Sequence, residues 1–426
     1  MYRCGVPETD DKAGDHAAKP PSDHAAKPPG DGHAARPPGD HAARPPALAT
    51  RPMRREPGEL ERFGRCFAGN GSPKRPELLA WQYLDNPTGE LFVDFALAPG
   101  APEAPEAGNE LAAIYATLPV RFRVAGQVAL ATQSVDTITD AGFRGRGLFV
   151  QLAKATYARA AAAGAKLVYG FPNGQSAHGF FERLGWTSLD PVPFLIRPLR
   201  TRYLVERLKL GAYARLVPDL PLFVSVDGVI ESAGSLPLVG PLVHRIVGPG
   251  RPGRRNTIER VTRFDERATA LWHAVAGETL IGIERDARYL NWRLIDKPFE
   301  HYDNVAATSG DRMTALVSHC VKDKHGGRIG YLMEALARPG ARGALGALVS
   351  RALGDMTRRG ADVALAWCLP HAPAYRTLRS SGFVPFPERL RPIELHAGVR
   401  AFDAGLADPI ADRRRWYLSY LDSDTV

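Results

Sequence analysis

The sequence is poor in cysteine, has no long apolar run and carries little net charge for its length. Its four cysteines are scattered, without a C-x-x-C pair or framework spacing: Cys4, Cys66, Cys320 and Cys368. This spacing indicates reduced thiols rather than a disulfide scaffold. No stretch reaches the roughly 18 apolar residues that cross a bilayer, and the N-terminus lacks the apolar region of a secretory signal. We therefore expect a cytoplasmic protein without membrane insertion.

The charge balance is only weak support for a nucleic-acid partner, and we expect none. Lys and Arg number 55 against 46 Asp and Glu, which gives a net charge of +9 over 426 residues. The hydrophobic fraction of 44% is enough for folded cores and excludes a wholly disordered chain. The length favours two or three folded units.

Residues 1–56 differ in composition from the rest of the chain. Four near-copies of D-(G)-H-A-A-[K/R]-P-P run from position 15 to position 46 and contain eight prolines and no aromatic residue. Such a segment cannot offset its ordering entropy by burial, so it is typical of a disordered, extended tail. The tail holds nine basic and eight acidic residues, so it is not a basic arm. Its single histidines, about eight residues apart, make poor chelators, and we expect no metal.

Residues 57–200 alternate between strand-like and helix-like patterns. The predicted helices are 59–67, 77–84, 148–163 and 176–184, and the predicted strands are 91–97, 112–115, 121–124, 127–136 and 166–171. The third helix is rich in alanine, the residue of highest helix propensity, and ends at Gly164. This order predicts a mostly antiparallel mixed sheet with one βαβ crossover, an α/β fold of the mixed α+β kind.

The same pattern recurs in the second half of the chain. W-Q-Y-L-D-N-P at residues 81–87 has a counterpart in W-R-L-I-D-K-P at 292–298, and residues 164–168 correspond to 360–364. The shared order of these landmarks indicates a tandem duplication. We expect an N-terminal domain, a basic Pro/Gly-rich connector and a second, similar domain, at 57–200, 201–256 and 257–426.

The sharpest local signal is D-A-G-F-R-G-R-G-L-F at residues 140–149, between a predicted strand and the Ala-rich helix. A glycine-containing loop that opens a helix leaves several backbone N–H groups available beside the positive end of the helix dipole. Gly145 and Gly147 let a phosphate approach the backbone, and Arg144 and Arg146 can add charge-assisted hydrogen bonds. The segment predicts an anion site, with an ordinary helix start as the alternative.

The run from Arg144 to Phe149, followed by Asn173 and then F-E-R-L-G-W at residues 181–186, resembles the GNAT superfamily of acyl-CoA-dependent N-acyltransferases. Arg144 and Gly147 match the family's [Q/R]-x-x-G-x-[G/A] loop, whereas Phe149 stands where Gly or Ala is usual. The resemblance covers about residues 58–200 and implies a GNAT fold of the tandem two-domain type. The second unit has R-P-G-A-R-G-A-L-G at residues 338–346, which does not keep the loop, so we expect it to be degenerate.

The resemblance also implies roles for individual residues. Acetyl-CoA would be the co-substrate, with its pyrophosphate on the loop and its pantetheine arm between the two central strands. The implied cofactor contacts are Ile138, Arg144, Gly145, Arg146, Gly147, Leu148, Phe149 and Asn173. Asp136, on the predicted strand before the loop, is the candidate proton acceptor, with a hydrogen-bonding role at the strand end as the alternative. Phe181 replaces the tyrosine that protonates the leaving thiolate in many members, so another donor such as Tyr169 or Ser176 acts, the thiolate leaves unaided, or catalysis is weak.

We predict an N-acetyltransferase acting on a primary amine of a small molecule, with an amino sugar of surface-polysaccharide metabolism as one possible acceptor. Two alternatives stay open: aminoacyl transfer of the peptidoglycan-bridge type, and a non-catalytic CoA-binding or scaffolding protein. The oligomeric state stays open as well. Residues 416–426 are aromatic almost to the end, which predicts packing on the body of the protein, and Asp422 or Asp424 is a further active-site candidate. Trp81, Tyr83, Trp292 and Tyr302 are predicted core residues, with a sugar-binding face as the alternative.

Overall fold

The computed structural model describes residues 47–99, 110–201, 203, 256–277, 280–324 and 326–423. The histidine-containing repeats, most of the basic connector and Asp424 lie outside these ranges. Residues 50–52, which the sequence placed in the tail, form an ordered edge strand whose Thr50 pairs with Ala96. Arg51 donates to the buried carboxylate of Glu59, and Met53 is buried. These contacts hold the segment against the first domain.

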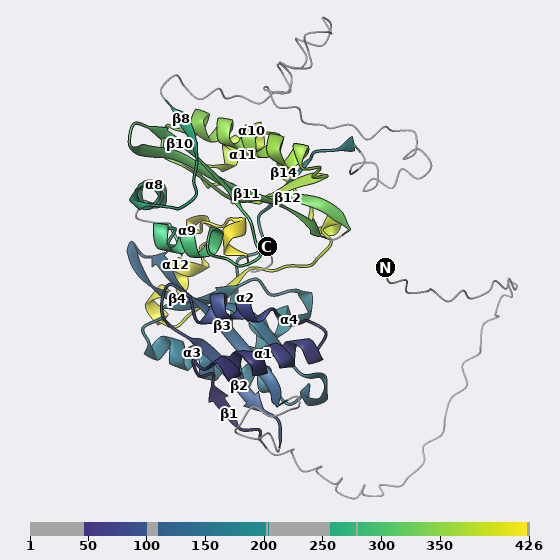
Figure 1. Ribbon diagram of the computed structural model, residues 1–426. Coiled ribbons are helices and arrows are strands. Elements are labelled where there is room, and N and C mark those ends of the chain that lie inside the picture. Colours follow the sequence, from purple (N-terminus) through teal and green to yellow (C-terminus); the bar gives the residue numbers. More distant parts are fainter. Residues whose placement is uncertain are drawn as a thin grey trace, which may run out of the picture. The chain divides into compact units, whose positions relative to one another are not determined.

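The first sheet contains eight strands, and in Figure 1 most of it lies in the purple to teal part of the chain. Its order is β1 (Thr50–Pro52), β2 (Phe92–Leu97), β3 (Leu111–Val124), β4 (Gln127–Thr139), β5 (Leu167–Gly170), β15 (Gly398–Ala401) and β6 (Thr187–Ser188), with β9 (Gly282–Ile283) beside β3. Neighbouring strands are antiparallel except β4 and β5, which are parallel. The two predicted strands 112–115 and 121–124 are one strand, because Pro119 keeps its place opposite Thr132 in the ladder.

The second sheet repeats this arrangement with seven strands. Its order is β8 (Thr257–Arg260), β10 (Asp303–Ser309), β11 (Arg312–Lys324), β12 (Gly327–Ala337), β13 (Val363–Trp367), β7 (Phe194–Pro198) and β14 (Val384–Pro385). Here too a single parallel pair, β12 with β13, lies among antiparallel neighbours. The chain is therefore a mixed α/β protein with two mixed sheets, as the sequence predicts.

Each sheet contains a strand from the other half of the chain, and the first sheet contains a second one, since the short strand β9 pairs with β3. Strand β7, from the first half of the chain, lies between β13 and β14 of the second sheet. Strand β15, from the second half, lies between β5 and β6 of the first sheet. Residues 194–197 of β7 are buried, so the exchanged strand is part of the core of its host sheet. Each sheet is completed only by the other half of the chain.

The helices follow the same order in both halves. The first half has α1 (Pro57–Gly69), α2 (Pro76–Tyr83), α3 (Leu148–Ala162), α4 (Gly174–His178) and a π-helical turn (Gly179–Arg183); the second has α8 (Glu266–Ala276), α9 (Ala287–Leu294), α10 (Arg342–Arg358), α11 (Tyr375–Ser380) and α12 (Ala407–Ala411). Short 3-10 turns occupy Ala141–Phe143, Glu388–Leu390, Ala404–Leu406, Arg413–Arg415 and Tyr420–Asp422. Helices α1 and α2 begin with proline, whose missing N–H is no loss in a first turn.

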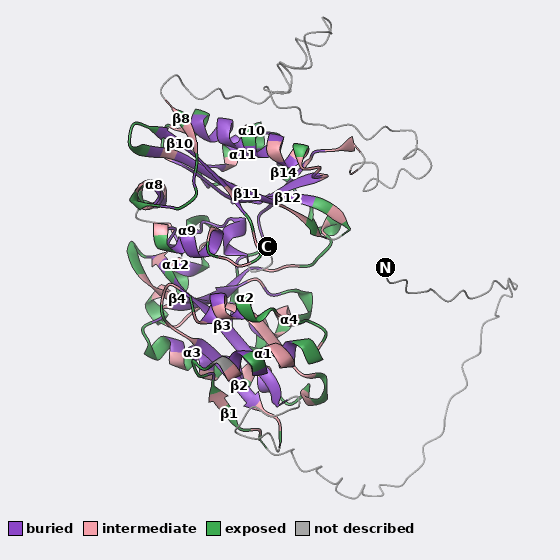
Figure 2. Cartoon of the chain, in the orientation of Figure 1, coloured by how far each residue is buried: buried purple, intermediate pink, exposed green. Residues whose placement is uncertain are grey.

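Helices cover both faces of the first sheet. Phe95 of β2 contacts Phe63 of α1, whereas the adjacent Asp94 accepts hydrogen bonds from Thr156 and Arg159 of α3. Because successive strand residues point to opposite faces, α1 and α3 lie on opposite sides. Figure 2 shows buried residues along the strands of both sheets. No helix among the described residues is long and apolar enough to cross a membrane.

The predicted core aromatics and C-terminal packing are confirmed. Trp81, Tyr83, Trp292 and Tyr302 are all buried, and so are residues 416–423 at the described end of the chain. The C-terminal segment contacts both halves, since Trp416 packs against Tyr169 of β5 while Tyr420 stacks on Trp367 of β13.

Candidate functional site

The glycine-rich loop ends at helix α3 in the geometry that an anion site needs. Gly145 and Gly147 have φ angles of 78° and 76°, in the left-handed region that favours glycine. Gly147 is the N-cap, and no described side chain caps the helix. Its first-turn N–H groups are thus available to a ligand. A Cβ at either glycine would meet nothing within 4 Å, so the space above the loop is open.

The side chains of the loop differ in their roles. Arg144 and Arg146 are exposed, with the Arg144 Nε 3.4 Å from the carbonyl oxygen of Thr139 and Arg146 lying over the Phe143 ring. Both can turn toward a bound phosphate. The Leu148 side chain is buried in the core, so only its backbone N–H can serve a cofactor.

Strands β4 and β5 separate beside this loop. Their parallel pairing ends at Ser134 opposite Gly170. In the same region the register between β3 and β4 shifts, because Ala116 pairs with Val135 whereas Ile114 pairs with Ile138. Two β4 residues therefore stand opposite one β3 residue, which is a β-bulge. Asp136 lies in this bulge with a φ of 45°.

A cavity of about 560 Å³ opens where the two strands part. We call it the β4–β5 cavity; it is lined by residues 134–139 of β4, Phe149, residues 170–173, Gln175, Ser176, Gly179, Phe180, Trp186 and residues 393–395. Of the predicted site residues, Asp136, Ile138, Phe149, Asn173 and Ser176 lie in this wall. Residues 393–395 come from the second half of the chain and were not anticipated from the sequence.

Asp136 is surrounded by hydrogen-bond donors from α2 and from the turn before it. Its carboxylate accepts hydrogen bonds from Gln82 Nε2 at 3.0 Å and Tyr83 OH at 2.9 Å, and it forms an ion pair with Lys74. An ionised carboxylate has about four acceptor positions, and three donors use most of them. The structure thus places Asp136 in the cavity wall as a braced carboxylate.

The other two predicted catalytic residues have different surroundings. Tyr169 is buried, and its hydroxyl donates to Gln133 Oε1 at 3.2 Å, away from the residues that line the cavity. The Ser176 hydroxyl lies 3.1 Å from Asn173 Oδ1, and the same oxygen accepts the Ser176 backbone N–H. Asn173 is the N-cap of α4, which is an ordinary local capping arrangement. Asn173 and Ser176 are thus held in the cavity wall, whereas Tyr169 does not line the cavity.

After β5, the chain points Phe180 toward the cavity, whereas the sequence motif had indicated Phe181. Helix α4 continues as a π-helical turn from Gly179 to Arg183, and this wider turn changes which side chains face inward. Phe180 lines the cavity and packs against Phe149, with ring centroids 5.1 Å apart. Phe181 instead lies against Gly398 and the imidazole of His396.

An Asp–His–Glu group stands beside the cavity, and no sequence motif indicated it. His396 Nδ1 lies 2.7 Å from Asp190 Oδ2, and Nε2 lies 3.0 Å from Glu394 Oε1. Glu394 is in the cavity wall. These carboxylates raise the pKa of His396, the hydrogen bond with Asp190 being the largest cause. Because Asp190 and His396 are 206 positions apart, only the folded chain brings them together.

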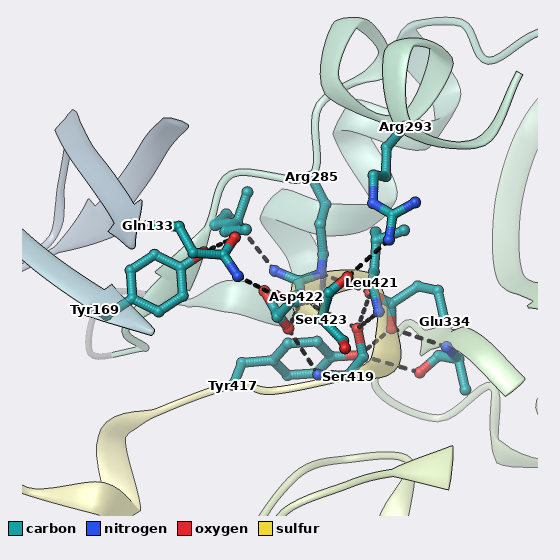
Figure 3. Close-up of polar contacts among 12 residues, drawn as sticks. Gln133, Tyr169, Arg285, Arg293, Glu334, Tyr417, Ser419, Leu421, Asp422 and Ser423 are labelled. Carbon is teal, nitrogen blue, oxygen red and sulfur yellow. Dashed lines mark hydrogen bonds and ion pairs between the residues drawn. The ribbon is translucent and has the colours of Figure 1, made fainter. Parts of the chain in front are cut away.

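A buried polar cluster holds the C-terminal segment (Figure 3). The Arg285 guanidinium donates to Glu334 and to Asp422, both at 2.6 Å, and Gln133 Nε2 donates to the Asp422 backbone carbonyl at 2.8 Å. Burial raises the pKa of Asp422 above its usual value. The hypothesis that Asp422 reaches the active site does not fit this position, because its carboxylate is paired with Arg285.

Among the described residues, one group has the side chains of a metal site: Asp303, His319 and Asp355. Arg359 Nη1 lies 2.7 Å from Asp303 and 3.4 Å from Asp355, so a guanidinium already neutralises both carboxylates. This arrangement is an ion-pair network.

One known family matches the part of the chain that contains most of this site. The family described as acetyltransferase (GNAT) domain matches residues 65–189, which include the loop, the bulge and most of the cavity wall. No curated protein sequence gives a significant match.

Several solved structures are similar to this chain in fold. A conserved protein from Enterococcus faecalis, described as a probable N-acyltransferase, gives a TM-score of 0.52 at 11% identity over 84% of this chain and 72% of its own. A GCN5-related N-acetyltransferase from Anabaena variabilis gives 0.53 at 10% identity over 84% and 73%. The Saccharomyces cerevisiae N-myristoyltransferase gives 0.50 at 12% identity over 83% and 80%. At these identities the similarity shows the fold alone.

Proposed function

Since its domain at residues 65–189 places the chain in the GNAT superfamily, we propose that it is an N-acyltransferase that moves an acyl group from acyl-CoA to a primary amine. The observation that carries the proposal is the β4–β5 cavity beside an uncapped helix start. The helix start suits the pyrophosphate of CoA, and the cavity suits its extended pantetheine arm.

The charges near the loop support a polyanionic ligand. Arg144 and Arg146 are exposed beside the helix start, where the helix dipole adds further positive potential. Two arginines at this position are enough to bind the phosphates of CoA. A nucleic-acid ligand is not required to explain them. The proposed pyrophosphate contacts are the backbone N–H groups that follow Gly145 and Gly147, with Ile138, Phe149 and Asn173 along the arm.

We propose acetyl-CoA as the donor and a small-molecule primary amine, such as an amino sugar, as the acceptor in the cytoplasm. The cavity wall offers polar groups for an acceptor, since Ser134, Thr137 and Glu394 stand in it with Asp136. In this proposal Asp136 takes a proton from the attacking amine after one of its three donors moves aside. The Tyr169 hydroxyl donates its hydrogen bond to Gln133 and does not line the cavity, so of the two proton donors suggested by the sequence only Ser176 stands in the cavity wall.

The second domain has a structural role in this proposal. Helix α10 begins at Arg342 after Gly340, whose φ is 83°, but the preceding segment lacks the second left-handed glycine that the first loop has. Its contribution to the site is the segment 393–395 and the exchanged strand β15. The domains at 57–200 and 257–426 thus complete each other by strand exchange across the connector.

The test is isothermal titration of acetyl-CoA into the full-length protein and into Gly147→Glu. We expect the wild type to bind and the variant to lose affinity by at least about 100-fold, because a carboxylate would occupy the pyrophosphate position at a cost of several kcal/mol. Absence of binding by the wild type would contradict every acyl-CoA hypothesis.

Transfer is then measured on an amine panel that contains glucosamine, with aminoacyl-tRNA as a second donor. Release of CoA thiol with formation of the amide supports the proposal. Aminoacyl transfer without acetyl-CoA binding would indicate the peptidoglycan-bridge class instead. Binding without turnover on any amine would indicate a CoA-binding sensor or scaffold.

A further inference from the structure

The family position for the thiolate's proton donor holds Phe181, which has no proton to give, and an imidazole from the second half of the chain lies against it. The rings of Phe181 and His396 have centroids 6.1 Å apart at 79°. The His396 backbone N–H donates to the Pro172 carbonyl at 2.9 Å, and the neighbouring Leu395 forms a bridge with Asn173. The segment with His396 is thus fixed along the edge of the β4–β5 cavity.

We propose that His396 is the general acid of the reaction and protonates the CoA sulfur as it leaves. Asp190 is then a positioning residue, and Glu394 returns the proton to the imidazole. The inference rests on the acyl transfer proposed above.

The geometry of the group supports these three roles. Asp190 Oδ2 accepts the Nδ1 proton at 2.7 Å, and its other oxygen accepts the Ala397 backbone N–H at 2.7 Å, so the carboxylate itself is held in place. A fixed Nδ1–H directs Nε2 toward Glu394, 3.0 Å away, which lines the cavity. Nε2 is therefore one hydrogen bond from the substrate space, and a thiolate that arrives there can replace Glu394 as its acceptor.

The protons and electrons balance over one turnover. The neutral amine attacks the thioester carbon and forms the C–N bond, then the C–S bond breaks and its electron pair goes to sulfur. His396 Nε2 gives its proton to that sulfur and forms the CoA thiol. The nitrogen of the new amide loses its extra proton to Asp136, which releases it to solvent, and the exposed Glu394 passes an equivalent proton from solvent to Nε2. The products are the amide and free CoA thiol.

The two flanking carboxylates shift the His396 imidazole toward its protonated form. Asp190 and Glu394 flank the ring on both nitrogens and raise the pKa of His396 above its ordinary value of about 6.5. The other charged groups near this site are Arg391 and Arg413, which interact with Asp190. The ordinary imidazole pKa of about 6.5 lies below the thiol pKa of about 8.5, so an imidazolium can protonate the leaving sulfur.

A competing hydroxyl route is less suited to the task. Ser134 lines the cavity, and the Tyr115 hydroxyl lies 2.9 Å from its Oγ and 2.6 Å from the Tyr157 hydroxyl. Burial raises the pKa of both tyrosines well above the usual value. These phenols are therefore weaker acids than the thiol, whereas His396 is not buried in this way, with 28% of its side chain exposed.

The experiment compares pH–rate profiles of the full-length wild type, His396→Gln and Asp190→Asn. Acetyl-CoA is the donor, glucosamine or the fastest amine of the panel is the acceptor, and CoA thiol release is the readout between about pH 6 and pH 10. Acetyl-CoA affinity is measured on the same samples by titration. The matched control is His301→Gln, which removes an exposed histidine 3.7 Å from Asp303 in the second domain.

We expect the wild-type kcat to fall as the pH rises through the raised pKa of His396. His396→Gln lowers kcat by about 100-fold, the usual scale of general acid catalysis, and abolishes this alkaline limb while acetyl-CoA affinity stays within about twofold. Asp190→Asn moves the limb to lower pH, because a carboxylate that stabilised the imidazolium is gone. His301→Gln behaves as the wild type.

Two different results would contradict the two proposals separately. A wild type that does not bind acetyl-CoA overturns the proposed function itself. A wild type that binds and transfers, together with a His396→Gln variant whose kcat is within about threefold and keeps the alkaline limb, overturns the role of His396 and leaves the function standing.

Discussion

Trp81 and Trp292 lie face to face, with ring centroids 4.4 Å apart and planes at 11°. Each indole N–H donates to the backbone carbonyl of the other residue, at 2.9 Å and 3.1 Å. Equivalent residues of two repeats meet in this reciprocal way only where the repeats are related by an approximate twofold axis. The pair therefore marks the axis about which the two sheets exchange strands.

This pair predicts coupled stability. We expect Trp81→Ala and Trp292→Ala each to lower the free energy of unfolding by about 3–5 kcal/mol, because a large buried aromatic side chain is lost. The double variant should cost less than the sum by at least about 0.5 kcal/mol, since the residues contact each other. Denaturant unfolding measures all three. Phe299→Ala is the control, because Phe299 is 61% exposed, and fully additive costs would contradict the coupling.

The loop glycine predicts an effect on cofactor affinity that is separable from backbone strain. Gly147→Ala forces a Cβ into the left-handed region at a cost of about 1–2 kcal/mol and crowds the pyrophosphate position, so acetyl-CoA affinity falls by at least about tenfold. Gly164→Ala, with a φ of 91° beyond the other end of α3, carries the same strain. Titration should show an unchanged affinity for Gly164→Ala; an equal loss in both would assign the effect to strain.

Asp136 predicts a loss of rate without a loss of binding. Asp136→Asn removes the proposed proton acceptor, and we expect kcat at neutral pH to fall by about 100-fold while the acetyl-CoA dissociation constant stays within about twofold. Steady-state kinetics and titration give the two numbers. Tyr83→Phe removes one donor to the same carboxylate and serves as the control, with a much smaller change expected. An unchanged kcat in Asp136→Asn would leave this residue as a brace of the bulge.

Asp355 should make a contribution to the free energy of unfolding that depends on pH. The hydrogen bond from His319 is the main cause that lowers the pKa of Asp355 from its ordinary value to about 2. A lowered folded-state pKa stabilises the fold above the unfolded value, near pH 4, and this contribution disappears as the pH falls through about 2. Asp355→Asn should therefore cost about 2 kcal/mol at pH 6 and little at pH 2. Denaturant unfolding at both values tests this, with the exposed Asp323→Asn as control; a cost that is the same at both values contradicts it.

The sequence anticipated the parts of the fold that depend on local pattern. Helix α3 was predicted within one residue because alanine and Gly164 act locally. The predicted strands 121–124 and 127–136 both exist, and they are joined by the tight turn at Ala125 and Gly126. The continuous strand β3 was divided in the prediction, because Pro119 usually interrupts a strand and only its neighbours decide whether it is tolerated.

The same division applies to the site. The residues from Arg144 to Phe149 stand in adjacent positions, so the sequence alone predicted an anion site at this helix start and indicated a GNAT domain. Glu394, His396 and Asp190 share no motif, and they meet because each half of the chain gives a strand to the other half's sheet. Only the tertiary structure brings these three residues together. Strand exchange depends on which strands of one sheet can pair with a strand from the other half of the chain, and no local sequence pattern encodes that pairing.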